Sequence, residues 1–297
     1  MNVAKMNHIR GQIRYNESMS KHTSWRVGGP ADQYFVPADL SDLQTYLAGL
    51  PANMPLTWVG LGSNMLVRDG GIRGTVIAPL GGLKTLEIIE PDLVYVEVGL
   101  SNSKVARYCQ KQKLSGAEYL AGIPGTIGGA LTMNAGAFGY ETWNLVEQVT
   151  MINHQGELID RKPDEFEINY RHVRLPEGEW FVAARLRLHE KSDEEDNKIK
   201  QLLQKRNDSQ PIGQPSCGSV FKNPPGKYSA QLIEAAGLKG HCIGAACISE
   251  KHANFIISNV ETRASEIEAL IVFIQKTIKQ KFDVSLETEV RFVGEAA

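Results

Sequence analysis

The chain has no bulk charge of either sign: its 297 residues include 32 Lys and Arg against 34 Asp and Glu, a net charge of −2. It therefore lacks the basic field that recruits nucleic acid or an anionic membrane. No apolar run reaches the length of a membrane span, and the N-terminus lacks the apolar core of a secretion signal. These absences predict a globular cytoplasmic protein that binds neither nucleic acid nor membrane.

Cysteine and metal-binding patterns are also scarce. None of the four cysteines forms a C-x-x-C pair, and the seven histidines form no H-E-x-x-H or similar cluster. The spacing of Cys242 and Cys247 fits no common zinc pattern. We expect reduced, mainly structural thiols and neither a structural nor a catalytic metal.

Positive charge is missing between Lys113 and Arg161, and this interval contains G-I-P-G-T-I-G-G-A-L-T-M-N-A-G-A-F-G at 122–139. Glycine lets a ligand approach backbone N–H groups closely, and successive N–H groups can form an anion site. The glycine spacing is neither that of a P-loop nor G-x-G-x-x-G. Two interpretations stay open: a phosphate site built from backbone dipoles alone, or a buried crossover where elements pack closely.

A second glycine turn, G-L-G-S-N at 60–64, follows an expected strand at 57–59. It again contains no basic residue. One interpretation is a tight turn between two elements. The other is a second N–H site, with Ser63 and Asn64 as side-chain donors to a phosphate.

Hydrophobic periodicity predicts a mixed α and β protein. The expected strands are 73–78, 85–90, 93–98, 145–152, 180–189 and 254–258. The expected helices are 41–50, 101–113, 126–133, 191–209, 228–236 and 262–281. Pro211 and Pro215 mark a boundary before a smaller α/β unit.

Three polar points accompany the glycine turns. Arg171 follows Asn169-Tyr170, and Ser219 lies in S-C-G-S-V-F-K-N-P-P-G at 216–226. Glu289 shares one face of an expected strand at 286–292 with Glu287 and Arg291. A surface arginine, a turn serine and a solvated edge strand explain these residues as well as an active site does, and Ser219 lies in no G-x-S-x-G pattern.

Taken together, the segments resemble the UDP-N-acetylenolpyruvoylglucosamine reductase (MurB) family, from about His22 to Gly294. The resemblance rests on T-S-W-R-V-G-G-P-A-D, G-L-G-S-N-M-L-V, G-I-P-G-T-I-G-G-A-L-T-M-N-A-G-A, N-Y-R, C-G-S-V-F-K-N-P, L-I-E-A-A-G-L-K-G, S-E-K-H-A-N-F-I and L-E-T-E-V-R-F. Each segment alone is weak evidence, but their order is highly specific.

The resemblance implies an α+β fold: a two-subdomain FAD-binding fold of the vanillyl-alcohol-oxidase/MurB type plus a smaller C-terminal α/β substrate domain. The FAD-binding region would be 1–205, with subdomains at about 1–80 and 81–205, and the substrate domain 206–297, its last strand returning to the active site. FAD would be bound non-covalently. The implied FAD-binding residues are Gly60, Leu61, Gly62, Ser63, Asn64, Gly122, Ile123, Pro124, Gly125, Thr126, Gly128, Gly129, Ala135 and Gly136.

The implied reaction is NADPH-dependent reduction of UDP-N-acetylglucosamine enolpyruvate to UDP-N-acetylmuramate in peptidoglycan synthesis. The implied catalytic residues are Arg171 and Glu289, which would stabilise a developing enolate, and Ser219, which would deliver a proton. That Glu289 is protonated, or donates through water, is a hypothesis. The implied substrate-binding residues are Lys222, Asn223, Arg206 and Gln210.

Two residues depart from the family pattern: Cys217 stands where Ala is frequent, and Thr288 where Pro is common. Cys217 could make Ser219 sensitive to thiol reagents. The interval between Arg171 and Ser219 is too short for the tyrosine-bearing loop of one subgroup, which indicates the compact subgroup. The alternatives are a flavin-dependent sugar or lactone oxidase of the same fold, and a non-catalytic nucleotide-binding module.

Overall fold

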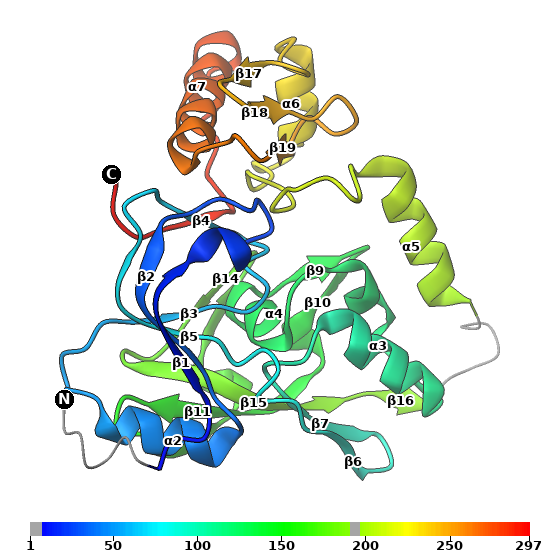
Figure 1. Ribbon diagram of the computed structural model, residues 1–297. Coiled ribbons are helices and arrows are strands. Elements are labelled where there is room, and N and C mark those ends of the chain that lie inside the picture. Colours follow the sequence, from blue (N-terminus) through cyan, green and yellow to red (C-terminus); the bar gives the residue numbers. More distant parts are fainter. Residues whose placement is uncertain (1–7, 191–196) are drawn as a thin grey trace. The chain divides into compact units, whose positions relative to one another are not determined.

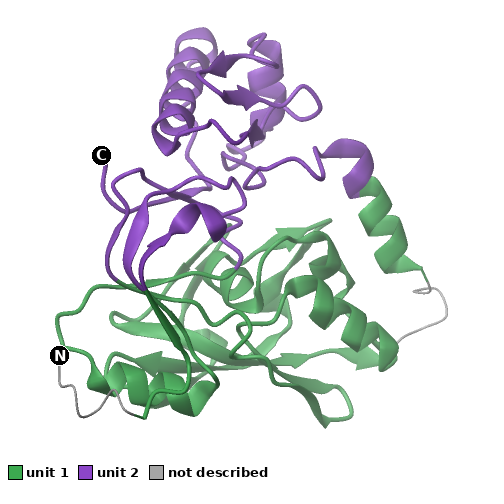
Figure 2. Ribbon diagram, viewed as in Figure 1, with its two compact units in different colours: residues 1–14, 34–60, 75–205 green, residues 15–33, 61–74, 206–297 purple. Residues whose placement is uncertain are grey.

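The computed structural model describes residues 8–190 and 197–297. The chain divides into two compact units, which Figure 2 colours separately. Unit 1 comprises residues 1–14, 34–60 and 75–205, and unit 2 comprises residues 15–33, 61–74 and 206–297. Each unit is assembled from three segments of the chain and has its own hydrophobic core.

A five-stranded sheet organises unit 1 (Figure 1), with the order β12-β11-β15-β7-β6 and antiparallel pairing throughout. Its strands are β6 (Leu86–Glu90), β7 (Leu93–Glu97), β11 (Val146–Asn153), β12 (Leu158–Arg161) and β15 (Glu179–Arg187). In β15, Leu186 is buried between the half-buried Arg185 and Arg187, so the alternation in sequence places the leucine in the core.

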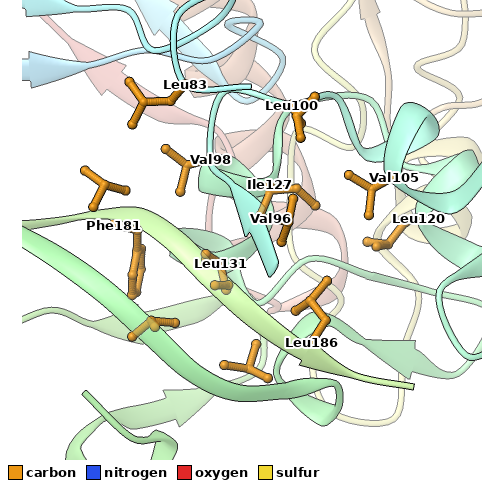
Figure 3. Close-up of a cluster of buried hydrophobic side chains, with 14 of the residues drawn as sticks. Leu83, Val96, Val98, Leu100, Val105, Leu120, Ile127, Leu131, Phe181 and Leu186 are labelled. Carbon is orange, nitrogen blue, oxygen red and sulfur yellow. The ribbon is translucent and has the colours of Figure 1, made fainter. Parts of the chain in front are cut away.

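Two helices of unit 1 lie close to the glycine-rich stretch. The helix α4 (Ile127–Met133) contacts β7 and β15, and α3 (Asn102–Lys111) contacts the short 3-10 helix η2 (Glu118–Gly122). Ile127 and Leu131 of α4 are buried in a cluster with Val96, Val98 and Phe181 (Figure 3). The start of α4 is therefore fixed by core packing.

The other elements of unit 1 are short. They are α2 (Leu40–Gly49), β3 (Leu56–Trp58), β8 (Leu114–Ser115), β9 (Gly136–Ala137), β10 (Tyr140–Glu141), η3 (Thr142–Asn144), η4 (Pro163–Glu165), β13 (Glu167–Asn169), β14 (His172–Arg174) and β16 (His189–Glu190). Four elements cross the division between the units along the chain: β1 (Gln12–Ser18), β2 (Pro30–Val36), β5 (Ile72–Ile77) and α5 (Lys198–Ser209). A four-stranded sheet has the order β1-β2-β5-β3.

Unit 2 has a three-stranded antiparallel sheet, β17-β18-β19, which contacts the long helix α7. Its elements are η1 (Met19–Lys21), β4 (Met65–Val67), α6 (Ser229–Ala235), β17 (Cys242–Ile243), β18 (Ala246–Ile248), β19 (Ile256–Ile257), α7 (Ala264–Phe282) and β20 (Arg291–Val293). The apolar stripe of α7 that starts at Ile267 is buried, as its helical spacing predicts. Within residues 8–190 and 197–297, no helix is both long and apolar enough to cross a membrane.

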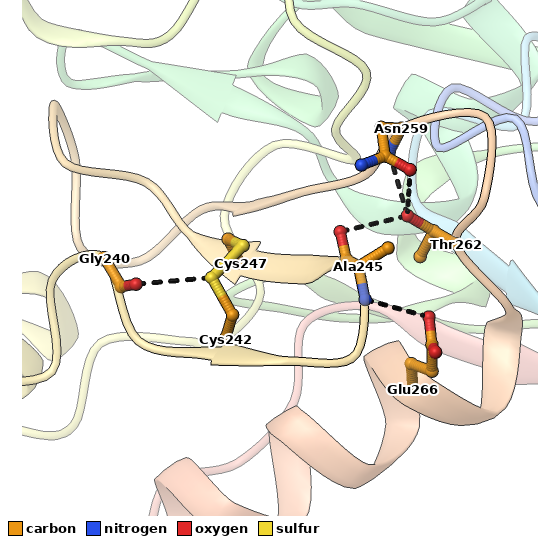
Figure 4. The surroundings of a disulfide bond; sticks show 7 residues. All are labelled: Gly240, Cys242, Ala245, Cys247, Asn259, Thr262 and Glu266. Carbon is orange, nitrogen blue, oxygen red and sulfur yellow. Dashed lines mark hydrogen bonds between the residues drawn. A yellow bond between two sulfur atoms is a disulfide. The ribbon is translucent and has the colours of Figure 1, made fainter.

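Cys242 and Cys247 form a disulfide, so the prediction of reduced thiols is wrong for this pair. The two residues are direct partners in the β17–β18 register, and their Cα atoms lie 4.1 Å apart. The turn between the strands is held by α7 and the loop before it, because Ala245 accepts from Thr262 Oγ1 and donates to Glu266 (Figure 4). Cys109 and Cys217 are free and buried, as predicted.

Most predicted elements match the structure, and one does not. The strand expected at 286–292 is interrupted, because Glu289 and Val290 form a bend and β20 begins only at Arg291. The helix predicted from 191 begins at Lys198, and residues 191–196 lie outside the described residues. The boundary at 206 coincides with the start of the last segment of unit 2, but the division into FAD-binding and substrate domains stays a prediction.

Candidate active site

The glycine-rich stretch of unit 1 enters α4 through a backbone bridge. Thr126 caps the helix, with its Oγ1 accepting from Gly129 N–H at 3.5 Å, and forms an isolated bridge with Ser101. Gly125, just before the cap, has a φ of +127°, which a residue with a Cβ rarely adopts. The glycine at this position is therefore required by the backbone conformation.

Several N–H groups at this helix start are already bonded. Ile127 donates to the Leu100 carbonyl at 2.9 Å, and Gly128 donates to the Val98 carbonyl at 3.1 Å. In the described part of the chain, the N–H groups of Gly125 and Thr126 donate to no acceptor. The open donors therefore lie two residues before the bonded ones in the chain.

The second glycine turn begins against the first. A Cβ built on Gly60 would lie 2.4 Å from Thr126 Oγ1, so only glycine permits this close approach. Further along the turn, in unit 2, Asn64 Nδ2 donates to the Glu289 carbonyl at 3.0 Å. Asn64 therefore has at most one amide N–H left for a phosphate, and its contact ties the turn to the segment that carries Glu289.

Arg171 lies at the tip of the β13–β14 hairpin in unit 1, with a left-handed φ of 56°. Its Nη2 donates to the Gly136 carbonyl at 2.7 Å, and its Nη1 donates to the Asn134 carbonyl at 3.4 Å. The guanidinium also lies over the Tyr170 ring, 4.7 Å from the centroid. A Cβ on Gly136 would approach Nη1 to 3.0 Å, so glycine leaves room for the arginine. The hairpin thus brings Arg171 to the end of the glycine-rich stretch.

Ser219 and Glu289 are neighbours in unit 2. Ser219 is half-buried between Gly218 and the buried pair Val220 and Phe221. The Glu289 N–H donates to the Val220 carbonyl at 2.8 Å. Glu289 is therefore hydrogen-bonded to the residue that follows Ser219. On the same side, Lys222 N–H donates to the Glu287 carbonyl at 2.9 Å.

The four expected substrate-binding residues are engaged within unit 2. Lys222 Nζ lies 2.5 Å from Glu287 Oε1, and the Asn223 side chain accepts from the first N–H of α6 at 3.1 Å. Arg206 Nε donates to Gln210 Oε1 at 2.8 Å, and burial lowers the pKa of the guanidinium. The Glu287 side chain is 73% exposed, so its ion pair with Lys222 contributes at most about 1 kcal/mol to stability. Lys222 can therefore leave Glu287 for another anionic partner.

The candidate residues fall in both units, and each group is described within its own unit. The structure places Ser219, Glu289 and Asn64 side by side in unit 2, and Arg171 beside the glycine-rich stretch in unit 1. Within the described ranges, no cluster of three or more His, Cys, Asp or Glu side chains could hold a metal ion.

The expected thiol sensitivity through Cys217 is contradicted by its surroundings. Its side chain is 2% exposed, and burial raises the pKa of the thiol to about 12. Its Sγ lies 3.4 Å from the Gly62 carbonyl and 3.5 Å from the Met65 carbonyl. Because the thiolate is the reactive form, this cysteine has a structural role.

Asn254 is a residue beside the Ser219 segment whose structural role sequence reasoning missed. Its buried amide donates to the Phe221 carbonyl at 2.8 Å and accepts from the Phe221 N–H at 3.0 Å, and its own carbonyl accepts from Val220 at 2.9 Å. Asn254 thereby pairs with the Ser219 segment as a strand would. In the sequence analysis, Asn254 appeared only as part of the motif S-E-K-H-A-N-F-I, and no role was assigned to it.

Comparison with known proteins gives matches over both halves of the chain. A family model described as FAD binding domain matches residues 31–161, and one described as UDP-N-acetylenolpyruvoylglucosamine reductase, C-terminal domain, matches residues 210–293. The UDP-N-acetylenolpyruvoylglucosamine reductases of Methylococcus capsulatus and Alkalilimnicola ehrlichii are 53% and 52% identical, over 97% and 96% of this chain and 95% and 96% of theirs. The crystal structure of the Thermus caldophilus enzyme (MurB) is similar with a TM-score of 0.81 at 31% identity, covering 96% of this chain and 99% of that one.

Proposed function

The chain belongs to the UDP-N-acetylenolpyruvoylglucosamine reductase family, and on this basis we propose how its own residues carry the reaction. It is an FAD-dependent oxidoreductase of peptidoglycan synthesis that reduces UDP-N-acetylglucosamine enolpyruvate. NADPH is the electron donor in this proposal. A cytoplasmic location is part of the proposal too, because it is the compartment of NADPH and nucleotide sugars.

The glycine turns fit a bound FAD without any charged side chain. Gly125 and Thr126 offer two open N–H groups, and Gly60 lets the second turn pack closely against Thr126. Between Lys113 and Arg161 the chain carries no Lys or Arg, so backbone dipoles would hold the diphosphate. The flavin, when bound, supplies the hydride that goes to the methylene carbon of the enolpyruvyl group.

Arg171 would stabilise the negative charge that develops as the substrate accepts hydride. That charge forms on the adjacent carbon and spreads into the carboxylate as an enolate. A guanidinium is always charged and donates in a fixed fork, which suits a carboxylate. The support is its orientation by two backbone carbonyls, of Gly136 and Asn134.

Ser219 would deliver a proton to the same carbon, with Glu289 beside it. A hydroxyl is a weak acid, but it suffices against a base as strong as an enolate carbon. The observation that carries this assignment is the backbone pairing of Glu289 with Val220, which sets the two side chains on adjoining segments. Glu289 would assist in protonated form or through a water. Lys222, Asn223, Arg206 and Gln210 would contact the remainder of the substrate.

The half-reactions of a Ser219→Ala variant test this proposal. Reduction of the flavin by NADPH should be nearly unchanged, while its re-oxidation by the enolpyruvyl substrate should slow by about 10²- to 10⁴-fold. Ser216→Ala is a matched control, since Ser216 lies in the same segment and its hydroxyl, among the described residues, bonds only to the Gln214 carbonyl, at 3.3 Å. Equal damage to both half-reactions would refute the role of Ser219.

A further inference from the structure

Asn102, the first residue of α3, lies against the glycine-rich stretch and is 1% exposed. Its backbone N–H donates to the Gly125 carbonyl at 3.1 Å, and its side-chain Nδ2 donates to the Ile123 carbonyl at 3.3 Å. Both contacts lie within unit 1. A single buried residue outside the glycine-rich stretch thus holds two of its carbonyl groups, on either side of Pro124.

The contact with Gly125 sets the direction of the Thr126 N–H. A trans peptide is planar, and its C=O and N–H groups point in opposite directions. The Gly125 carbonyl and the Thr126 N–H belong to one such peptide, so the bond from Asn102 to the carbonyl turns the Thr126 N–H away from α3. The backbone of Asn102 therefore aims one of the two open donors of the stretch.

The side chain of Asn102 restricts the other open donor, the Gly125 N–H. It holds the Ile123–Pro124 peptide, and the ring of Pro124 fixes the φ angle that follows. The Gly125 N–H lies in the next peptide, between the two that Asn102 holds. Glycine permits the φ of +127° at Gly125 but does not fix it, so the restraint comes from Asn102.

Stability alone does not account for an asparagine at this position. Its Oδ1 is buried and accepts no hydrogen bond from the described residues. A buried acceptor without a partner costs folding free energy. The reverse orientation of the amide would set Oδ1 against the Ile123 carbonyl oxygen, so Nδ2 is the atom that faces it. The side chain thus carries a cost at one end and holds the 123–126 segment at the other.

We infer that Asn102 is a positioning residue for FAD, which aims the Gly125 and Thr126 N–H groups at the diphosphate. The inference rests on the proposed placement of the diphosphate at the glycine turns. Asn102 needs no contact with the cofactor for this role. Loss of its side-chain amide would free the Ile123–Pro124 peptide, and FAD would then have to order the segment as it binds, which lowers affinity.

The FAD affinity of Asn102→Ala tests the inference. Full-length holoenzyme is diluted, and the fluorescence of the released FAD gives the dissociation constant. We expect FAD to bind about tenfold more weakly than to the wild type, since the Ile123 carbonyl loses its partner. Ser103→Ala is the matched control, because Ser103 is the next residue of α3 and no described hydrogen bond joins its side chain to residues 122–126. That variant should change the affinity by less than about twofold.

Asn102→Asp separates positioning from packing, because aspartate has the shape of asparagine and lacks its donor. At about pH 8 the carboxylate cannot donate to Ile123, and FAD should bind about tenfold or more weakly than to the wild type. Burial raises the pKa of such a carboxyl, so at about pH 5 its protonated form donates to the same carbonyl. The affinity should then return to within about threefold of the wild type at that pH.

Unchanged affinity in Asn102→Ala, or a failure of Asn102→Asp to recover at low pH, would overturn the inference. Should Asn102→Ala not fold, the pH profile of Asn102→Asp carries the test. Gly60→Ala identifies which hypothesis has failed. If it weakens FAD binding and Asn102→Ala does not, only the inference about Asn102 fails; if neither does, the diphosphate does not lie at these turns.

Discussion

Replacing Asn254 by alanine should destabilise unit 2 and misplace Ser219. Asn254 and Phe221 are 4% and 1% exposed, and the asparagine amide bonds both the N–H and the carbonyl of Phe221. Truncation leaves these two backbone groups buried without a partner. Each such group costs about 1–3 kcal/mol, so the free energy of unfolding should fall by about 2–6 kcal/mol.

Two measurements check this prediction. Urea unfolding, followed by circular dichroism, gives the change in the free energy of unfolding, and stopped-flow absorbance gives the re-oxidation rate of the flavin at low temperature. Asn259→Ala is the control, since Asn259 is exposed in the same segment and water can replace its Oδ1 contacts with the Glu261 N–H and Thr262 Oγ1; it should change stability by less than about 1 kcal/mol. A loss below about 0.5 kcal/mol in Asn254→Ala, with normal re-oxidation, would refute the reasoning.

Four further predictions concern the glycine turn and the cysteines. Gly60→Ala places a Cβ 2.4 Å from Thr126 Oγ1, an overpacking cost of about 1–3 kcal/mol, and should weaken FAD binding by roughly tenfold or more in a fluorescence titration; unchanged affinity would contradict the role of this turn. Burial raises the pKa of Cys109 and Cys217 to about 12, so neither should be labelled by a thiol reagent in the native protein at pH 8, as mass spectrometry would show. The folded state keeps these two protons while the unfolded state loses them, so stability should fall from about pH 9 upward by up to about 1.4 kcal/mol per thiol and pH unit; a flat profile between pH 9 and 11 would argue against it. Reducing Cys242–Cys247 opens a short loop and should cost about 2 kcal/mol in urea unfolding, and an unchanged midpoint would show that the pair is already reduced in solution.

Local patterns of the sequence predicted much of the fold. The helical spacing of Ile267, Leu270 and Ile271 predicted the buried stripe of α7, and the alternation after Ala184 predicted the face of β15. These predictions held because burial in each case follows from a period of the sequence. The hairpins β13–β14 and β17–β18 were missed, since their strands have only two or three residues.

The site was predicted less completely, because its contacts join distant parts of the chain. Order and spacing singled out Arg171, Ser219 and Glu289, but not Asn102 or Asn254. An asparagine that bonds a backbone segment 33 residues away leaves no periodic signal. The glycines of 122–129 were recognised, whereas the use of the Ile127 and Gly128 amides by neighbouring carbonyls could be seen only in three dimensions.

The disulfide also could not be predicted from the sequence. The spacing of Cys242 and Cys247 gives five residues of separation and no known motif. The pairing depends on the hairpin register, which places the two residues directly opposite each other. The register in turn depends on the turn at Gly244 and its contact with Glu266, a residue of another element.

The central claim is that this chain carries a flavin that accepts electrons from NADPH and passes them to an enolpyruvyl ether. Its most direct test is the visible absorption spectrum of the purified protein, recorded before and after anaerobic addition of NADPH and then of UDP-N-acetylglucosamine enolpyruvate. We expect flavin absorbance that NADPH bleaches and the substrate restores, with one UDP-N-acetylmuramate formed per flavin. A protein that takes up no FAD, or a reduced flavin that oxygen re-oxidises and the substrate does not, would contradict the account.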